Sequence, residues 1–461
     1  MNTMINFDSA MIKKDDCHGP RYTSYPTAVE FNAEVSNDVY IDEFDTIRQS
    51  SKPLSLYFHI PFCQSLCFYC ACAKIITKKH ERSIPYLERV YKEIQHQGAL
   101  VGSRRVVEQL HFGGGTPTFL SDEQFEVLFD NIRENFTLAP VEQREFSIEI
   151  DPRAVRASTI PLLRELGFNR ISLGVQDFDA KVQKAVNRIQ SVEQTFDVLD
   201  AARAAGYKSV SVDLIYGLPC QTVASFKKTL DIVLQKMPDR MSIYSYAHMP
   251  DKVRSQRTLN ADDLPDPATK LAIFEMTVNY LQKAGYVYIG MDHFALPTDE
   301  LALAKKNGTL QRNFQGYSTH ADTDLIGIGM TSIGKVNDCF IQNQHTEEAY
   351  FDAIEDTGLA VRRGYKLSKD DCMRRDIIQA LMCQNKVIIA DVSSKYQINF
   401  FDYFEKEMTN LLSMVEDKLV TFNDKEIKVT NAGQLLLRNV AMIFDAYIKP
   451  KNDKVIFSST I

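Results

Sequence analysis

The chain has 461 residues, which is too long for one compact hydrophobic core, so we expect two or more domains. Hydrophobic residues make up 44 % and charged residues 25 % of the sequence, as in ordinary globular proteins. No apolar run approaches the roughly 18 residues of a membrane span, no export signal is visible, and the net charge of −7 disfavours nucleic-acid binding. We therefore expect a cytoplasmic protein without a membrane or nucleic-acid partner, in which an anionic substrate needs a local basic pocket.

The first 50 residues carry no sustained hydrophobic period, and we interpret residues 1–50 as an extended arm that lies over a domain. Its segment Gly19–Thr27 is rich in turn residues and places Arg21 and Tyr22 between two prolines. We expect such a segment to bury little apolar area. The guanidinium fork of Arg21 suits a carboxylate, so the arm is predicted to serve catalysis more than folding.

Short strand patterns alternate with helical periods from Ser55 onward, which indicates parallel strands joined by right-handed crossovers. The clearest helix follows Leu120, where Ser121 and Gln124 form a capping box. Six strand–helix units predict an α/β fold, a partial (three-quarter) parallel (β/α)6 barrel, with a doubly wound sheet as the alternative. The predicted strands are Ser55–Ile60, Val106–Phe112, Glu145–Ile150, Arg170–Val175, Ser209–Ile215 and Arg240–Tyr246, with an extra one at Val287–Met291.

Three cysteines follow the first strand with the spacing Cys63-x-x-x-Cys67-x-x-Cys70, and Cys72 comes two residues later. Three thiolates on one short loop can hold three irons of a 4Fe–4S cluster and leave the fourth iron open, whereas a fourth ligand would saturate it. A structural zinc site usually pairs two Cys-x-x-Cys knuckles, and nine cysteines, an odd number, disfavour a disulfide framework. We predict a cluster, with zinc or inert thiols as the alternatives.

Polar residues gather at the predicted carboxyl ends of the strands, where parallel α/β folds carry their chemistry. The triple glycine Gly113–Gly115 lets a backbone approach a ligand closely, although a tight turn would explain it about as well. The other residues at these ends are Thr116, Pro117, Glu149, Asp151, Gln176, Asp177, Asp213 and Tyr246–His248.

A third region begins at about Lys366, and its strand patterns at Lys418–Phe422 and Ile427–Thr430 precede a helix from near Asn431 to Tyr447. This order resembles a winged-helix unit. The last helix carries only one basic residue, Arg438, so we favour a small docking domain over a nucleic-acid-binding one. The expected division is an arm or lid at 1–50, a catalytic domain at 51–365 and a small, mainly helical, winged-helix-like domain at 366–461.

Taken together, the motifs resemble the oxygen-independent coproporphyrinogen III oxidase family, which belongs to the radical S-adenosylmethionine (SAM) superfamily. The cysteine spacing carries the resemblance to the superfamily, and the arm and two later motifs carry the resemblance to the family. The matching segments are Gly19–Thr27, Tyr57–Cys63, Gly113–Thr118, Ile148–Arg153, Gly174–Asp177, Asp213–Pro219, Gly290–Phe294 and Arg312–Tyr317.

The resemblance implies a role for each matching residue. Cys63, Cys67 and Cys70 are expected to ligate the cluster, and Cys72 is expected to lie near it without ligating. A first SAM is expected to contact Tyr57, Tyr69, Gly113, Glu149 and Ile333. A second SAM is expected at Gly114, Gly115, Gln176, Arg188, Asp213 and Ala247, with Thr116 as a further cofactor contact. The residues expected to act in catalysis or substrate binding are Arg21, Tyr22, Cys72, Phe314 and Gln315.

The implied reaction is the oxidative decarboxylation of two propionates of coproporphyrinogen III to vinyl groups, which gives protoporphyrinogen IX in haem biosynthesis. A SAM-derived 5′-deoxyadenosyl radical abstracts a hydrogen from the propionate. We expect a flavodoxin- or ferredoxin-like electron donor and a monomeric protein. The main alternative is a haem chaperone with the same fold and cluster, but that family carries a tryptophan in the motif at Arg312–Tyr317, and this chain has no tryptophan. A radical SAM enzyme with another substrate is a further alternative.

Overall fold

The computed structural model describes residues 5, 7–47, 49–156, 158–320, 323–448, 457 and 460. Its centre is a sheet in which six parallel strands lie side by side in chain order, as the alternation of strands and helices predicts. These strands are β1 (Leu54–Ile60), β4 (Val106–Gly114), β6 (Glu145–Ile150), β7 (Arg170–Gln176), β8 (Ser209–Tyr216) and β9 (Arg240–Ser245). Each lies within one or two residues of its predicted bounds.

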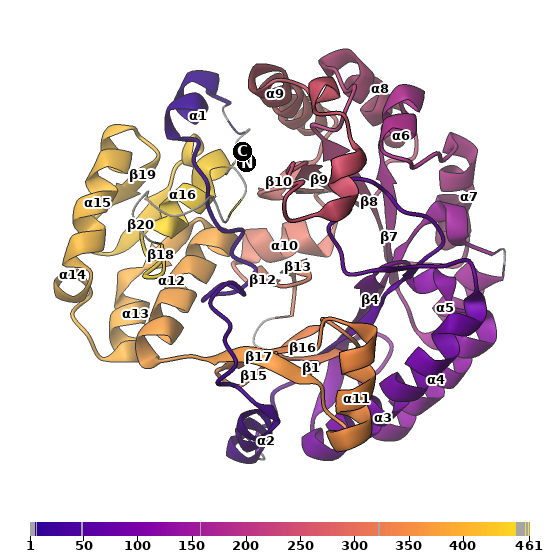
Figure 1. Cartoon of the computed structure of the whole chain (residues 1–461). Helices are drawn as coiled ribbons and strands as arrows, with labels where there is room; N and C mark the ends of the chain where they lie inside the picture. The colour runs from indigo at the N-terminus through magenta and orange to yellow at the C-terminus, as the bar shows by residue number, and fades with distance from the viewer. Residues whose placement is uncertain are drawn as a thin grey trace.

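The helices that connect these strands form an outer layer on one side of the curved sheet (Figure 1). They are α3 (Ser83–Val101), α4 (Asp122–Asn135), α5 (Thr159–Leu166), α6 (Ala180–Ala185), α7 (Val192–Ala204), α8 (Val223–Leu234) and α9 (Pro267–Lys283). The predicted capping box is present at the start of α4, where Ser121 and Gln124 exchange hydrogen bonds with each other's backbone. Phe125, Leu128 and Phe129 on the same helix are buried against the sheet.

The sheet extends beyond the six predicted strands at both ends. Beside β1 lies the parallel strand β14 (Asp324–Ile328), followed by the antiparallel strands β15 (Ile333–Val336), β16 (Cys339–Asn343) and β17 (Val361–Lys366). Beside β9 lies the antiparallel pair of β11 (His293–Ala295) and β10 (Val287–Gly290), and β10 is the predicted extra strand. β10 and β17 therefore end the path of strands, which makes this an open, partial barrel.

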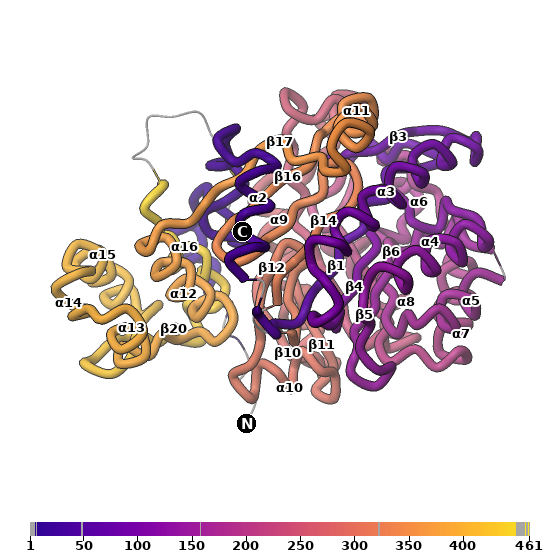
Figure 2. Tube along the Cα trace, turned by 90° about the horizontal axis from the view of Figure 1, so that it is seen from below, coloured from indigo at the N-terminus to yellow at the C-terminus, as the bar shows by residue number. Residues whose placement is uncertain are grey.

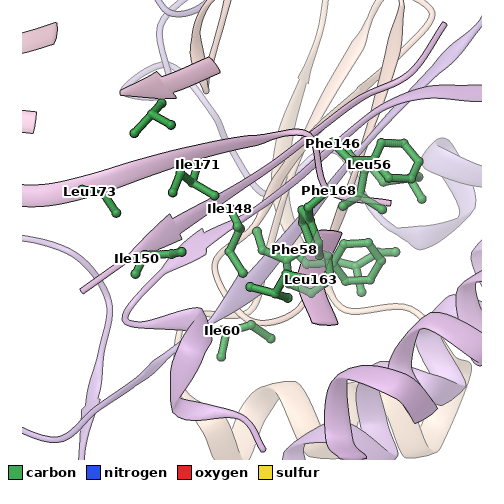
Figure 3. Packing of buried hydrophobic residues seen from close by; sticks show 14 of the residues in the cluster. Leu56, Phe58, Ile60, Phe146, Ile148, Ile150, Leu163, Phe168, Ile171 and Leu173 are labelled. Carbon is green, nitrogen blue, oxygen red and sulfur yellow. The ribbon is translucent and has the colours of Figure 1, made fainter. Parts of the chain in front are cut away.

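The main hydrophobic core lies between the parallel strands and the outer helices, and Figure 3 shows its centre. Alternate residues of each strand point into it, because successive side chains of a strand face opposite sides. Phe58 stacks on Phe112 with ring centroids 4.6 Å apart, and Phe168 contacts Phe112 edge-on. The residues of opposite parity point into the barrel and are largely polar, for example Ser147, Ser172 and Asp213.

The C-terminal region lies at one side of the barrel in both views (Figures 1 and 2), and it packs around a second core that also includes residues of the arm and of the barrel's edge. A three-stranded sheet of β18 (Lys386–Ile388), β19 (Val420–Phe422) and β20 (Glu426–Val429) supports helices α12 (Lys369–Gln384), α13 (Ile389–Tyr396), α14 (Phe400–Tyr403), α15 (Glu405–Glu416) and α16 (Leu437–Met442). The helix expected from Asn431 to Tyr447 is shorter than predicted: a 3₁₀ turn at Gly433–Leu436 precedes α16, which ends at Met442.

The N-terminal segment differs from the prediction in two respects. It contains two short helices, α1 (Ser9–Asp15) and α2 (Asn37–Thr46), where an extended chain was expected. Our expectation that the arm buries little apolar area is also wrong, because Tyr22 and Tyr25 are 3 % and 2 % exposed and belong to the second core. Their partners lie more than 400 residues away in the chain, which no local pattern could indicate. Among the described residues, no helix is long and apolar enough to span a membrane.

Candidate functional site

The cysteine-bearing loop leaves the carboxyl end of β1 and is held at both of its ends. Cys63 ends the short strand β2 (Phe62–Cys63), which pairs in parallel with β3 (Ile75–Ile76) across the base of the loop. Within the loop, the ammonium of Lys74 donates hydrogen bonds to the carbonyls of Cys70 and Cys72, over 2.8 and 3.2 Å. Because its backbone carbonyls are bonded, the loop presents its thiols in a fixed arrangement.

A second anchor comes from the segment after β9, which sequence analysis did not single out. The side-chain amide of Gln256, which is 2 % exposed, donates to the carbonyls of Tyr69 and Ala247 over 3.0 and 3.1 Å. The hydroxyl of Ser255 donates to the carbonyl of Cys70 over 3.1 Å. The predicted cofactor contacts Tyr69 and Ala247 are thereby brought together by Gln256. No motif signals this residue, because its role depends on the approach of two distant loops.

All four clustered cysteines line one cavity of about 330 Å³ at the carboxyl edge of the parallel strands. The hydroxyl of Thr116 lies 3.5 Å from the sulfur of Cys63, and guanidinium nitrogens of Arg153 and Arg188 lie 3.6 and 3.5 Å from that of Cys67. Burial raises the pKa of Cys63 to about 11, despite the hydrogen bond from Thr116. A cation bound among these sulfurs would offset that penalty, because it favours the thiolate.

The donor set fits a 4Fe–4S cluster. Cys63, Cys67 and Cys70 reach the same cavity from one loop, and cationic Arg153 and Arg188 lie beside it to balance the negative charge of thiolates. Within the described part of the chain, no three His, Cys, Asp or Glu side chains gather closely enough to hold a single metal ion. A cluster does not require that, since each thiolate binds a different iron.

Asp151 organises the cationic side of the cavity. Its carboxylate accepts from Arg153 over 2.7 Å and from Arg188 over 3.1 Å, and all three side chains are largely buried. Arg188 also donates to the carbonyl of Gly174. Arg188 was expected to pair with a cofactor carboxylate, and in the structure its near partner is Asp151. Neither Asp151 nor Arg153 was among the predicted site residues, although both stand at the end of the third predicted strand.

Glu149 lies on the opposite side of the cavity with His111 behind it, the imidazole nitrogen 3.4 Å from the carboxylate. Burial alone would raise the pKa of Glu149. The hydrogen bond and charge of His111, together with the backbone N–H of Gly114, outweigh burial and hold the pKa of Glu149 below its usual value. Glu149 is therefore an ionised acceptor, suited to the hydroxyls or ammonium of a ligand.

The triple glycine is required by close approach rather than by a turn alone. A Cβ at Gly113 would lie 3.1 Å from the carboxylate of Glu149, and one at Gly115 would lie 2.6 Å from the backbone carbonyl of Pro61. Gly114 has a φ of 107°, and a Cβ there would lie 2.6 Å from the ring of His59. Gly114 and Gly115 line the cavity, whereas Gly113 lies behind Glu149.

Gln176 and Asp213 extend the cavity along neighbouring strands. A β-bulge between Gly174 and Gln176 and a φ of 69° at Gln176 turn this residue out of the regular strand pattern. Asp213 accepts a hydrogen bond from Ser172 over 2.7 Å, and burial raises its pKa to about 6. Both side chains line the same cavity as the thiols, together with Arg188.

Four predicted cofactor contacts do not line the cavity: Tyr57, Gly113, Ala247 and Ile333. Tyr57 stacks on His111 at 5.9 Å and lies 3.2 Å from a ring nitrogen of His59. Ile333 begins β15 and packs on the second core. Ala247 takes part through its backbone carbonyl.

The predicted catalytic residues fall in three places. Cys72 lies in the thiol cavity and is exposed. Arg21 forms an ion pair with Asp292 and lies 5.8 Å from the ring centre of Tyr244, which lines the cavity. The hydroxyl of Tyr22 donates to Asp445 over 2.9 Å, so this side chain faces the C-terminal region.

Phe314 and Gln315 lie in the turn of a hairpin formed by β12 (Gln311–Asn313) and β13 (Gly316–Ser318). Gln315 lines a second cavity of about 130 Å³ inside the barrel, and its buried amide nitrogen has no hydrogen-bond partner in the described part of the chain. This cavity shares Glu149, Ser172, Asp213 and Tyr244 with the thiol cavity. Phe314 packs edge-on against Phe340 instead.

Comparison with known proteins adds independent evidence. The Radical SAM superfamily model matches residues 57–233, and the HemN C-terminal domain model matches residues 367–436. The chain is similar to the oxygen-independent coproporphyrinogen III oxidase of Pseudomonas aeruginosa, with 48 % identity over 97 % of each chain. It is 44 % identical to the Escherichia coli protein of that name, over 99 % of each chain. The solved coproporphyrinogen III oxidase (HemN) from Escherichia coli, described as a radical SAM enzyme, superposes with a TM-score of 0.92 at 43 % identity, covering 97 % of this chain and all of that one.

Proposed function

Since the chain belongs to the oxygen-independent coproporphyrinogen III oxidases, a family of radical SAM enzymes, we propose that it decarboxylates two propionates of coproporphyrinogen III to give protoporphyrinogen IX. One observation carries this proposal: three thiols of one loop share a cavity with an ionised carboxylate and a glycine cradle. The haem-chaperone alternative is not favoured, because the relatives matched over nearly their whole length are named as oxidases.

The cluster ligands in this proposal are Cys63, Cys67 and Cys70. A 4Fe–4S cluster and SAM bound there would supply the radical chemistry that removes a hydrogen atom from the substrate propionate. Arg153 and Arg188 would stabilise the charge of the thiolate at Cys67, since each places a guanidinium nitrogen within about 3.6 Å of its sulfur. Cys72 would stay free, close to the cluster but outside its coordination.

The residues that line the cavity would hold two SAM molecules. Glu149 is ionised and would accept from the ammonium or ribose hydroxyls of the first SAM, beside Tyr69 and the backbone of Gly113. Gln176, Asp213 and the backbone of Gly114 and Gly115 would hold the second, next to it. Arg188 would form an ion pair with a SAM carboxylate while it also stays paired with Asp151. Tyr57, Ile333 and Ala247 would complete these sites from behind the cavity wall.

The arm and the hairpin would bind the substrate. Arg21 would release Asp292 and bind a propionate of the substrate in its place. It lies next to Tyr244, which lines the thiol cavity. Gln315, with its unpartnered buried amide, would donate to a bound group from the barrel side. Tyr22 would hold the arm in position through its hydrogen bond to Asp445. Phe314 would hold the hairpin in position by packing on Phe340.

We further propose a flavodoxin- or ferredoxin-like donor that docks at the cysteine loop, where Gln64, Ser65, Ala71 and Cys72 are exposed. The division into 1–50, 51–365 and 366–461 remains a prediction, because the second core combines residues after 366 with Tyr22 of the arm and Tyr317 of the β12–β13 hairpin. A monomeric state and a cytoplasmic location remain predictions.

The test is an anaerobic assay of reduced, cluster-loaded protein with SAM and coproporphyrinogen III. We expect carbon dioxide, 5′-deoxyadenosine and protoporphyrinogen IX as products. Cys63→Ser protein, treated identically, is the matched control and should give none of them. Release of 5′-deoxyadenosine without any carbon dioxide would show that another substrate is used. Equilibrium binding of SAM to the same protein should reach two molecules per chain.

A further inference from the structure

A third cavity, of about 240 Å³, lies where the arm, the β12–β13 hairpin, the start of β14, β15 and helices α12 and α13 meet. Its wall includes Ser24 of the arm, Arg312 of the hairpin, Lys335 of β15, Arg375 of α12 and Lys395 of α13. It shares Asn313 with the cavity inside the barrel, which in turn borders the thiol cavity. The proposed function has so far given this third cavity no role.

Among the residues that the structure describes, three hydrogen-bond donors in this wall have no partner. The Nη1 atom of Arg312 and the hydroxyl of Ser24 are buried and make no hydrogen bond, and Arg312 is only 6 % exposed. The ammonium of Lys335, which is half-buried, has no hydrogen bond or ion pair with any residue that the structure describes. Buried donors are rarely left unbonded in folded proteins, because each costs about 1–3 kcal/mol.

The charges in the wall are strongly unbalanced toward positive. Asp376 is the one carboxylate among the described lining residues, and it already accepts from Lys395 over 2.6 Å and lies 3.5 Å from Arg375. Arg375 has a second acid, Asp338, at 3.0 Å. His320, at the far side, lies 3.4 Å from Glu108. Among the described residues, these pairs leave Arg312 and Lys335 without an ion-pair partner of their own, within a protein whose net charge is −7.

The position of Lys335 ties this cavity to the reaction site. Lys335 and Ile333 stand two residues apart on β15, so their side chains share one face and their Cα atoms are separated by roughly 7 Å. Both are half-buried, while Gly334 and Val336 between and beyond them are buried. Ile333 is one of the proposed contacts of the first SAM. A group bound at Lys335 would therefore lie next to the reaction site, though outside the thiol cavity.

We propose that this cavity binds a carboxylate of the substrate that is not the one being lost, with Lys335 and Arg312 as its cations and Ser24 as a neutral donor. The proposal deepens the proposed function and rests on it. Coproporphyrinogen III carries four propionates, so a macrocycle that presents one to the radical has others to anchor. Burial, together with the neighbouring Arg375, lowers the pKa of Lys335, because the more distant Asp324 and Asp338 offset only part of that cost and neither is an ion-pair partner of its ammonium. A bound carboxylate would supply that partner.

The test compares Lys335→Met with Lys335→Arg, and uses Lys92→Met, on the exposed face of α3, as the matched control. We expect the KM for coproporphyrinogen III to rise at least about tenfold in Lys335→Met with kcat within about twofold, because a ground-state contact is lost. Lys335→Arg should restore most of the affinity, and Lys92→Met should match the wild type. Thermal melting checks the fold, and Lys335→Gln serves if the methionine variant does not fold.

A second experiment distinguishes binding of the substrate from binding of a free anion. Sodium acetate should weaken the binding of coproporphyrin III to the wild-type protein and should have no such effect on Lys335→Met. If acetate binds but the KM of Lys335→Met equals that of Lys92→Met, the cavity holds an adventitious anion only and the proposal is wrong. A wild-type protein that fails to decarboxylate would instead overturn the proposed function itself.

Discussion

The thiol cavity and the junction between the arm and the C-terminal region are built in opposite ways. The cavity is made by the ends of consecutive parallel strands, so its residues follow from the order of the strands. The junction joins the two ends of the chain: Arg438 donates to the carbonyls of Gly19 and Pro20, and Tyr22 donates to Asp445. The repeated strand–helix units therefore position the residues of the thiol cavity, whereas contacts between the two chain ends position the arm.

This comparison predicts that the thiol cavity loses its function when its backbone is displaced. The junction, in contrast, should be weakened by the loss of single side-chain contacts.

Gly115→Ala should abolish cluster loading. The new Cβ would lie 2.6 Å from the backbone carbonyl of Pro61, which cannot move without displacing the strand that leads to Cys63. Iron content and the visible absorbance of the reconstituted protein measure the effect. Gly285→Ala is the comparison variant: its φ of 94° strains the backbone but a Cβ there meets nothing within 4 Å, so the cluster should still load. Normal iron content in Gly115→Ala would show that the glycine cradle is not needed.

Arg21→Ala should lower turnover by about tenfold or more, the scale of losing a charge-assisted contact. Asp292→Asn tests the same ion pair from its other side and leaves the guanidinium available. If Arg21 anchors a propionate, Asp292→Asn should keep far more activity than Arg21→Ala. Equal losses of activity and of melting temperature in the two variants would mean that the ion pair between Arg21 and Asp292 only holds the arm in place and does not bind the substrate.

Asp213→Asn should weaken SAM binding yet stabilise the fold at neutral pH. Burial raises the pKa of Asp213 to about 6 from the ordinary value of 3.8, so its contribution to stability is full below pH 3.8 and is lost as the pH rises through 6. Asparagine carries no charge to bury, so we expect it to add about 1–3 kcal/mol above pH 6. Melting at pH 4 and pH 7.5 measures this. A variant less stable than wild type at pH 7.5 would contradict it.

Tyr22→Phe should cost only about 1 kcal/mol of stability, the usual value of one hydrogen bond. It removes the bond to Asp445 and keeps the buried ring. Denaturant unfolding measures the loss, and Tyr91→Phe on α3, whose hydroxyl makes no hydrogen bond with any described residue, is the control. A loss no larger than that of the control would mean that the hydroxyl does not hold the junction.

The sequence was most informative where function and fold share a local pattern. Short strand-like runs that alternate with helical periods predicted the six parallel strands, and Ser121 and Gln124 marked the start of α4 because a capping box is a short-range interaction. The four cysteines, Glu149, Gln176 and Asp213 were correctly expected at one edge, since parallel strands end together.

Other features could not be read from the sequence, because each depends on distant partners. Asp292 as the partner of Arg21, Asp151 as the partner of Arg188, and Gln256 as the anchor of the cysteine loop are examples. The burial of Tyr22 and Tyr25 is another, since it needs the C-terminal core. The missing hydrophobic period and the turn residues of the arm predicted little burial, but Tyr22 and Tyr25 are buried once the C-terminal core is present.

The central claim is that three of the four clustered thiols, and not the fourth, hold the cluster. Anaerobic reconstitution of Cys67→Ser and Cys72→Ser, followed by iron analysis and visible absorbance, tests it directly. Cys67 is buried between two arginines and Cys72 is exposed, so we predict loss of the cluster in Cys67→Ser and a full cluster in Cys72→Ser. Retention of the cluster in Cys67→Ser together with its loss in Cys72→Ser would contradict the account.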